Sequence, residues 1–374
     1  MAGSVTAEQD LVDRRFMAAA IRLSRRNLGL TSTNPSVGTL IVRDDGNGPV
    51  IVGCGVTAVG GRPHAEPQAL ADAGELARGA TAYVTLEPCA HHGRTPPCAN
   101  ALVDAGIARV VGAASDPDTR VSGKGYAILR SAGIEVRERV LAAEAADQLA
   151  GYLNRSVNKR PEVILKLALS ADGMIGRRGA GQIAITGEIA RRQVHVMRAE
   201  CDAILIGIGT AIADNPELTV RLPGLRTRSP ARIVLDRLVR LPVTSKLAMS
   251  ARDVPVLVAA CSEGDAPNKA ALERLGVKFL ATESFDGRVA LPELLEDLAS
   301  KGMSRIIVEG GADTARAFLD EGLVDRIALF YGPEAIGTDG IAAPIGRDHI
   351  PAGFSLVREA RFGEDIFAEW IREI

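Results

Sequence analysis

Short apolar runs and amphipathic stretches alternate along the first part of the chain. Apolar runs bounded by polar or turn-forming residues predict strands at residues 37–42, 50–53, 81–86 and 108–112. Between them, apolar residues at three- and four-residue intervals predict helices at 11–26, 65–77, 98–105 and 124–132. Gly106 and Gly133 stand directly after two of these helices, where glycine commonly ends a helix. The alternation predicts an α/β fold with a largely parallel sheet.

The same alternation resumes after a polar segment in the middle of the chain. Residues 154–160 are polar and lead into Pro161, a composition typical of a linker. Further strands are predicted at 163–169, 203–206, 232–236, 254–260, 305–309 and 326–331. Because 374 residues are enough for two hydrophobic cores, we predict one domain at 1–153 and a second at 161–374.

Composition narrows the class of protein. The apolar fraction of 47% is that of an ordinary globular chain, and the formal charge of -2 provides no basic field for nucleic acid. The polar first residues lack the apolar core of a signal peptide, and no run reaches the roughly 18 uncharged apolar residues of a membrane helix. Five scattered cysteines suit a reducing compartment. We therefore expect a cytoplasmic protein without a nucleic-acid or membrane partner.

One short segment and one loop carry the residues of a catalytic zinc site. A single residue separates His64 from Glu66, and Cys89, which follows Pro88, precedes Cys98. One imidazole and two thiolates can bind tetrahedral Zn²⁺ and leave its fourth position to a water molecule, while the nearby carboxylate moves that water's proton. We predict that His64, Cys89 and Cys98 bind zinc and that Glu66 is the catalytic acid/base of a base deaminase.

The cysteine spacing departs from the usual base-deaminase signature, because eight residues rather than two separate Cys89 from Cys98. The strand predicted at 81–86 leads to Cys89, and Pro96 and Pro97 place Cys98 at the start of a helix, so both sulfurs can still converge on one ion. Taken singly, the histidine could be an ordinary helix-start residue, and the cysteines a disulfide or buried thiols. Their combination, in this order, favours the metal site.

Two glycine turns in the second half follow predicted strands. Gly310 and Gly311 lead into a helical stretch at 313–320, an arrangement that directs main-chain amides at an anion. Simple chain reversal also explains such a turn, and Asp313 or Thr314 could cap the helix. The second turn is at 207–210. Neither turn has the G-x-G-x-x-G pattern, so the sequence predicts a nucleotide-binding half at most and not a standard Rossmann domain.

Four charged residues lie in or beside apolar strands of the second half, namely Lys166, Asp172, Asp214 and Glu309. An unpaired charge there is costly, so they either pair with one another or face a ligand. For Asp172 and Asp214 a turn-forming role explains the position equally well.

Five segments resemble a known family: 34–38 (NPSVG), 63–66 (PHAE), 79–98, 203–210 and 308–311. Over about residues 12 to 340 the chain is similar to the bifunctional riboflavin-biosynthesis deaminase/reductases, the RibD family, whose cysteines have this eight-residue spacing. The resemblance implies a cytidine-deaminase-like α/β/α domain followed by a dihydrofolate-reductase-like α/β domain. It implies zinc-dependent removal of an amino group from a phosphorylated ribosylaminopyrimidine, then NADPH-dependent reduction of the ribosyl group to ribityl, in a dimer or tetramer.

The resemblance also implies roles for individual residues. For the deaminase substrate it implies contacts from Asn34, His91, Arg94 and Asp116. A solvated polar loop is the alternative for His91 and Arg94. For the reductase substrate the resemblance implies contacts from Lys166, Arg198, Leu218, Arg221 and Glu309. For NADPH it implies Ala168, Thr210, Asp214 and the turn formed by Gly311, Ala312, Asp313, Thr314, Ala315, Arg316 and Ala317.

Four positions depart from the family pattern. Thr57 replaces a histidine of many members, Gln182 and Ala184 replace a serine and a tryptophan, and Glu334 replaces a lysine. Two alternatives to the bifunctional enzyme therefore stay open. One is a monofunctional deaminase with a C-terminal nucleotide-binding or assembly module. The other is a nonenzymatic nucleotide-binding protein with a structural zinc.

Overall fold

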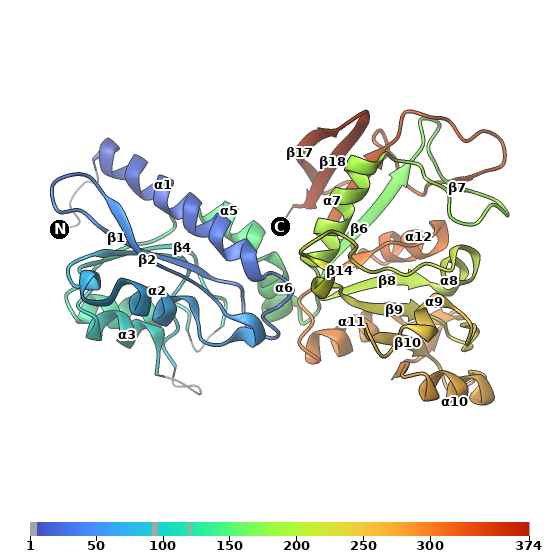
Figure 1. Ribbon diagram of the computed structural model, residues 1–374, viewed down its shortest axis with the longest axis horizontal. Coiled ribbons are helices and arrows are strands. Elements are labelled where there is room, and N and C mark those ends of the chain that lie inside the picture. The colour runs from blue at the N-terminus through green and yellow to red at the C-terminus, as the bar shows by residue number, and fades with distance from the viewer. Residues whose placement is uncertain (1–5, 92–95, 119–120, 374) are drawn as a thin grey trace. The chain divides into compact units, whose positions relative to one another are not determined.

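The computed structural model describes residues 6–91, 96–118 and 121–373, and the chain divides into two compact units, Met1–Asn158 and Lys159–Ile374 (Figure 1). The division lies inside the polar segment 154–160. That segment is not an irregular linker, because helix α6 (Ala150–Asn158) continues through its first part. The helix persists there because Tyr152 and Leu153 pack against the apolar core of the first unit.

The first unit is built on a five-stranded sheet with the order β2-β1-β3-β4-β5. Its strands are β1 (Gly38–Arg43), β2 (Val50–Val56), β3 (Thr81–Leu86), β4 (Arg109–Ala114) and β5 (Glu135–Arg137). The prediction of a largely parallel sheet is wrong for half of it, since β1 is antiparallel to both β2 and β3. A tight turn joins β1 to β2, in which Asp44 accepts hydrogen bonds from the main-chain N–H groups of Gly46 and Gly48.

Helices cover this sheet and enclose one apolar core (Figure 1). They are α1 (Ala7–Ser24), α2 (Ala65–Ala73), α3 (Cys98–Asp104), α4 (Lys124–Ser131), α5 (Ala142–Gln148) and α6. Gly106 and Gly133 follow α3 and α4 with φ of 71° and 82°, as predicted for helix ends. A Cβ on Gly53 or Gly55 would come within 2.3 or 2.1 Å of a carbonyl oxygen of α2. These glycines therefore let α2 lie directly on β2, which fixes the position of its first residues.

The second unit is built on a nine-stranded sheet with the order β11-β10-β9-β8-β14-β6-β15-β18-β17. The strands are β6 (Glu162–Leu169), β8 (Ala203–Gly207), β9 (Ala231–Leu235), β10 (Val256–Ala260), β11 (Lys278–Ala281), β14 (Arg305–Val308), β15 (Arg326–Tyr331), β17 (Phe354–Phe362) and β18 (Asp365–Arg372). All neighbours from β11 to β15 are parallel, as predicted. The hairpin of β17 and β18 adds an antiparallel edge that the sequence pattern did not predict.

Two apolar clusters lie on the two faces of this larger sheet. Alternate residues of β6 belong to different clusters, with Val163 and Leu165 in one and Ile164 in the other. The covering helices are α7 (Glu188–Ala199), α8 (Ile208–Asp214), α9 (Lys246–Met249), α10 (Ala266–Arg274), α11 (Leu291–Ser300) and α12 (Ala312–Asp320). Two short pairs complete the unit: β7 (Met174–Arg177) with β16 (Gly340–Ala342), and β12 (Ser284–Phe285) with β13 (Arg288–Val289). No helix among the described residues is long and apolar enough to cross a bilayer.

Candidate active sites

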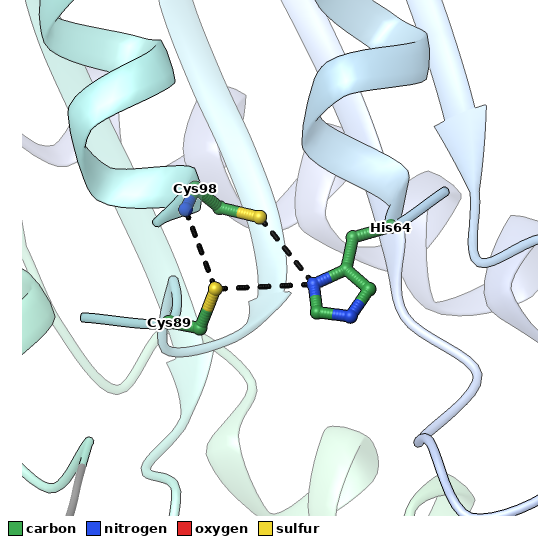
Figure 2. Close-up of side chains that lie close together, drawn as sticks. All are labelled: His64, Cys89 and Cys98. Atoms are coloured by element: carbon green, nitrogen blue, oxygen red, sulfur yellow. Dashed lines mark hydrogen bonds between the residues drawn. The ribbon is translucent and has the colours of Figure 1, made fainter. Parts of the chain in front are cut away.

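Three side chains of the first unit that can bind a metal ion converge from three elements (Figure 2). His64 immediately precedes α2, Cys98 is the first residue of α3, and Cys89 lies in the loop after β3. His64 Nδ1 lies 3.4 Å from Cys98 Sγ and 3.9 Å from Cys89 Sγ. A tetrahedral zinc ion requires its ligand atoms to be roughly 3.5 to 4 Å apart, so the three residues fit this metal. The predicted ligands are thus brought together by the fold.

Cys89 and the start of α3 lie close together in spite of the long cysteine spacing. The main-chain N–H of Cys98 donates to Cys89 Sγ at 3.3 Å, and that of Ala99 donates to the Cys89 carbonyl at 3.2 Å. Hydrogen bonds from Cys98 and His64 lower the pKa of the Cys89 thiol to about 4, which favours the thiolate that a metal requires. All five cysteines are free thiols, so the disulfide alternative is wrong.

Glu66 lies in the first turn of α2 and is only 4% exposed. Burial, with the negative charge of Cys89, raises the pKa of its carboxyl to about 7, and interaction with the Cys98 thiol partly opposes that rise, so the carboxyl lies next to the three converging side chains. A carboxyl with this pKa can both accept and release a proton near neutral pH. The arrangement therefore brings three side chains that can bind a metal ion and one carboxyl that can transfer protons to a single site.

Three of the four remaining deaminase candidates lie among the described residues. Asp116 follows β4, is 6% exposed, and accepts a hydrogen bond from the main-chain N–H of Asp118 at 2.9 Å. Asn34 lies in the turn before β1 and packs against Gly61, where a Cβ would approach Asn34 Nδ2 to 2.4 Å. His91 Nδ1 is buried without a partner in the described structure. Arg94 lies outside the described residues.

Thr57, the departure from the family pattern in this unit, has a structural contact of its own. Its Oγ1 accepts a hydrogen bond from the main-chain N–H of Val37 at 3.0 Å, and the residue is 1% exposed. The threonine therefore fixes the chain just before β1, close to the turn that carries Asn34.

The second unit gathers charge around one buried carboxylate. Arg198 of α7 binds Glu309 through two parallel hydrogen bonds of 2.7 and 2.8 Å, and Lys166 Nζ lies 3.8 Å from Glu309 Oε2. Burial alone would raise the pKa of Glu309, but the positive charges of Arg198 and Lys166 hold it at about 2. Burial lowers the pKa of Lys166 despite that carboxylate. The sequence left open whether Lys166 and Glu309 pair with each other or face a ligand. The structure shows that they pair with each other.

The two glycine turns adjoin because β8 and β14 are neighbours in the sheet. Thr210 Oγ1 accepts a hydrogen bond from the main-chain N–H of Gly311 at 3.0 Å. Gly311 is the N-cap of α12, and no side chain makes a capping hydrogen bond there, so the alternative that Asp313 or Thr314 caps this helix is wrong.

Other cofactor candidates have contrasting environments. Asp313 is exposed and lies 3.6 Å from Arg316 in an ion pair. Ala312 opens α12, whereas Ala315 and Ala317 are buried in the core. Ala168 lies on β6 opposite Phe330. Asp214 ends α8, and burial raises its pKa.

Asp172 has the turn-forming role that the sequence left open. Its carboxylate accepts hydrogen bonds from the Ser170 hydroxyl and from the main-chain N–H groups of Ile336 and Gly337, at 2.5 to 2.9 Å. A second hydrogen bond joins the same two segments: the Glu334 carbonyl accepts from the main-chain N–H of Ala171 at 2.8 Å.

The segment after α8 carries two further candidates. Leu218 is buried with φ of 56°, and Arg221 is half exposed with its guanidinium 3.3 Å from Glu217. Gln182 and Ala184 are exposed.

His195 of α7 is a residue that the sequence analysis missed. Its Nδ1 accepts a hydrogen bond from the main-chain N–H of Arg221 at 3.4 Å, and it lies one turn before Arg198. Burial and the charges of these two arginines lower its pKa to about 4, so the ring is neutral at pH 7. The three-residue spacing from Arg198, which puts both side chains on one helix face, was the available signal.

Comparisons with known proteins agree with this description. The family model "Cytidine and deoxycytidylate deaminase zinc-binding region" matches residues 11–114, and "RibD C-terminal domain" matches residues 161–367. The riboflavin biosynthesis protein RibD of Aquifex aeolicus is 38% identical over 95% of this chain and 97% of its own length.

Two solved structures are similar over nearly the whole chain. RibD of Acinetobacter baumannii, form 1, has a TM-score of 0.83 at 37% identity and covers 98% of this chain and 100% of its own. A diaminohydroxyphosphoribosylaminopyrimidine deaminase/5-amino-6-(5-phosphoribosylamino)uracil reductase of Thermotoga maritima has a TM-score of 0.83 at 32% identity, and it covers 97% and 99% of the two chains.

Fold and site thus define a two-part enzyme in which a zinc-binding deaminase region precedes a reductase domain. The chain belongs to the RibD family of riboflavin-biosynthesis proteins. The predicted fold class and the predicted cofactors, zinc and NADPH, are those of this family. The two alternatives, a C-terminal assembly module and a nonenzymatic zinc protein, are not supported.

Proposed function

We propose that this chain catalyses two consecutive steps on a phosphorylated ribosylaminopyrimidine. Water first replaces the 2-amino group of a diaminohydroxyphosphoribosylaminopyrimidine, with release of ammonia. NADPH then reduces the ribosyl group of the resulting aminouracil to a ribityl chain. The observation that carries the first step is the convergence of His64 Nδ1 and two cysteine sulfurs beside a buried carboxyl with a pKa of about 7.

In the first step, His64, Cys89 and Cys98 would hold the zinc ion, which when bound lowers the pKa of a water molecule so that it can attack the ring. Glu66 holds a proton at its buried carboxyl and delivers it to the departing amino group, because it is the acid/base group next to the ligands. Asp116 and Asn34 orient the aminopyrimidine, and His91 and Arg94 contact its ribose phosphate.

In the second step, NADPH when bound supplies a hydride, and the residues of the second unit orient the two reactants. The main-chain amides of the first turn of α12 suit a phosphate of the cofactor, and Thr210 holds that turn in place by accepting from the Gly311 N–H. Because Glu309 already binds both charged groups of Arg198 and Lys166, we assign the substrate phosphate to the half-exposed Arg221. Leu218 lies beside it in the same segment.

We assign deamination to residues 1–153 and reduction to residues 161–374. We further propose a cytoplasmic enzyme that acts on a small molecule and forms a dimer or tetramer. The net charge of -2 supports a small-molecule substrate over a nucleic acid.

The test is an assay of the purified chain with the diaminopyrimidine nucleotide, with and without NADPH, that follows ammonia and NADPH absorbance separately. Wild-type protein should release ammonia without NADPH and oxidise NADPH only after deamination. We expect Glu66→Gln to keep stoichiometric zinc but to lose ammonia release by at least about 10²-fold, because the amide cannot carry the proton. Glu75→Gln, an exposed glutamate shortly after α2, is the matched control. Deamination at the wild-type rate in Glu66→Gln would refute the assigned role.

A further inference from the structure

Helix α6 lies outside the matched deaminase region, residues 11–114, yet it contacts a residue at the deaminase site. The Tyr152 hydroxyl lies 3.1 and 3.2 Å from the two carboxylate oxygens of Asp116, to which it donates a hydrogen bond. This contact joins α6 to the loop that follows β4.

Asp116 stands at the zinc-binding end of the sheet. Strands β3 and β4 are parallel, and Leu86 pairs with Ala114, the last residues of the two strands. Asp116 and Cys89 follow these paired ends by two and three residues, and the charge of Cys89 acts on the Asp116 carboxyl. In a sheet of this kind ligands bind beyond the carboxyl ends of the strands, so Asp116 faces the space next to the metal ligands.

The buried Asp116 carboxylate needs donors to hold one orientation. A carboxylate with 6% exposure is costly unless it is hydrogen-bonded. In the described structure its donors are the main-chain N–H of Asp118 and the hydroxyl of Tyr152. The first belongs to the same loop as Asp116, whereas Tyr152 belongs to a separate helix that packs on the core. Tyr152 is thus the contact that ties the carboxylate to the rest of the unit.

The same stretch of chain also contacts the turn that carries Asn34. The Arg155 guanidinium donates to the carbonyl of Thr33 and lies over the Tyr152 ring, 5.9 Å from its centroid. Gln148 Nε2 is 3.5 Å from the carbonyl of Ser36. The end of the first unit therefore reaches both segments that we assign to the aminopyrimidine.

We propose that Tyr152 is a positioning residue of the deaminase site, which holds the Asp116 carboxylate in the orientation that accepts hydrogen bonds from the amino groups of the pyrimidine. This inference rests on the proposed deaminase function. The substrate carries several N–H donors, and a fixed carboxylate is an acceptor that discriminates in favour of them. Asp116 touches the substrate, and Tyr152 acts through Asp116.

The test compares Tyr152→Phe with Tyr126→Phe in the full-length zinc enzyme. Tyr126 is the matched control, because its buried hydroxyl makes no hydrogen bond to the described residues. We expect Tyr152→Phe to raise the KM for deamination roughly tenfold, the effect of losing one hydrogen bond to a charged group, with a much smaller change in kcat. Zinc content and NADPH oxidation with the deaminated substrate should stay at wild-type values in both variants.

A double-mutant cycle separates positioning from a general structural effect. If Tyr152 acts through Asp116, adding Tyr152→Phe to Asp116→Ala, which removes both acceptor oxygens, should cause no further rise in KM. An unchanged KM in Tyr152→Phe, a fully additive loss in the double variant, or loss of zinc or of NADPH oxidation in Tyr152→Phe would each overturn the inference. Failure of the proposed function itself is distinguishable, since wild-type protein would then release no ammonia.

Discussion

The buried Glu309 carboxylate shows how a single residue holds two cations in place. Arg198 and Lys166 both face it, and all three side chains are at most 13% exposed. Such a pair contributes little net stability compared with apolar residues, but the loss of one partner leaves an uncompensated buried charge. The arrangement therefore fixes the positions of Arg198 and Lys166 in the reductase unit and makes Glu309 essential to them.

Glu309→Gln should lower the free energy of unfolding of this unit by about 3 kcal/mol at pH 7 and abolish NADPH oxidation. The pKa of Glu309 is about 2 in the folded state, below its ordinary value of 4.5, so its stabilising effect is complete above about pH 4.5 and is lost as the pH falls toward 2. Denaturant unfolding from pH 7 to 3 should show the difference between wild type and variant narrowing below pH 4.5. A difference in the free energy of unfolding that stays constant over this pH range would contradict this reasoning. The control is Glu273→Gln, a substitution at an exposed residue.

Individual site residues were predictable when their chemistry was local in the sequence. His64, Glu66, Cys89 and Cys98 have a spacing and residue type that few other sites require, and the fold brings all four together. Tyr152 could not be predicted, because its partner Asp116 is 36 positions away and a tyrosine on an amphipathic helix is ordinarily a core residue. Such contacts depend on tertiary packing, which no local pattern encodes.

Among secondary structure elements, prediction succeeded where burial gives a clear pattern. Strand β3 has the predicted bounds, and its residues are buried almost without interruption. Strand β17 was missed because most of its residues are exposed, so apolar and polar positions do not alternate. The antiparallel pairing of β1 with β2 was not predicted, because the apolar pattern of a single strand carries no information about the direction of its neighbour.

Strand β9 anchors the segment that follows α8 through a buried arginine. Arg232 is fully buried, and its guanidinium donates to the carbonyls of Glu217, Ser250 and Val254 and to the Ser250 hydroxyl. No carboxylate accepts from it in these hydrogen bonds, and burial lowers its pKa to about 10. The cation therefore serves to satisfy main-chain carbonyls, one of which directly precedes Leu218.

Arg232→Met should destabilise the reductase unit by about 3 kcal/mol or more, because several buried carbonyls lose their donor at once. It should also raise the KM of the reduction step, since the chain at Leu218 and Arg221 loses its anchor. Guanidinium unfolding and NADPH-oxidation kinetics measure the two effects. The exposed Arg240→Met should change stability by no more than about 0.5 kcal/mol. Equal stability of the two variants would show that the anchor is unimportant.

In the whole molecule, each unit has its own sheet and apolar core. One apolar core belongs to the first unit. Two apolar clusters, one on each face of the larger sheet, belong to the second. The two units meet between residues 158 and 159, inside the polar segment 154–160. The helix in the first part of that segment was not predicted, because a helix stabilised by packing at Tyr152 and Leu153 needs few apolar residues. All proposed zinc ligands lie in the first unit, and all residues proposed for the reduction step lie in the second.

Removal of zinc should therefore affect the two activities differently. The ion would join the start of α2, the start of α3 and the loop after β3, so its loss removes a cross-link within the first unit only. A ligand that binds the native state alone stabilises it by mass action, and a loss of several kcal/mol lowers the Tm of a domain of this size by roughly 10 °C. Treatment with a chelator should abolish ammonia release, shift one of two calorimetric transitions downward, and leave NADPH oxidation with the deaminated substrate intact. Added zinc should restore ammonia release. If NADPH oxidation disappeared together with the metal, the two units would not be independent in the way their separate cores require.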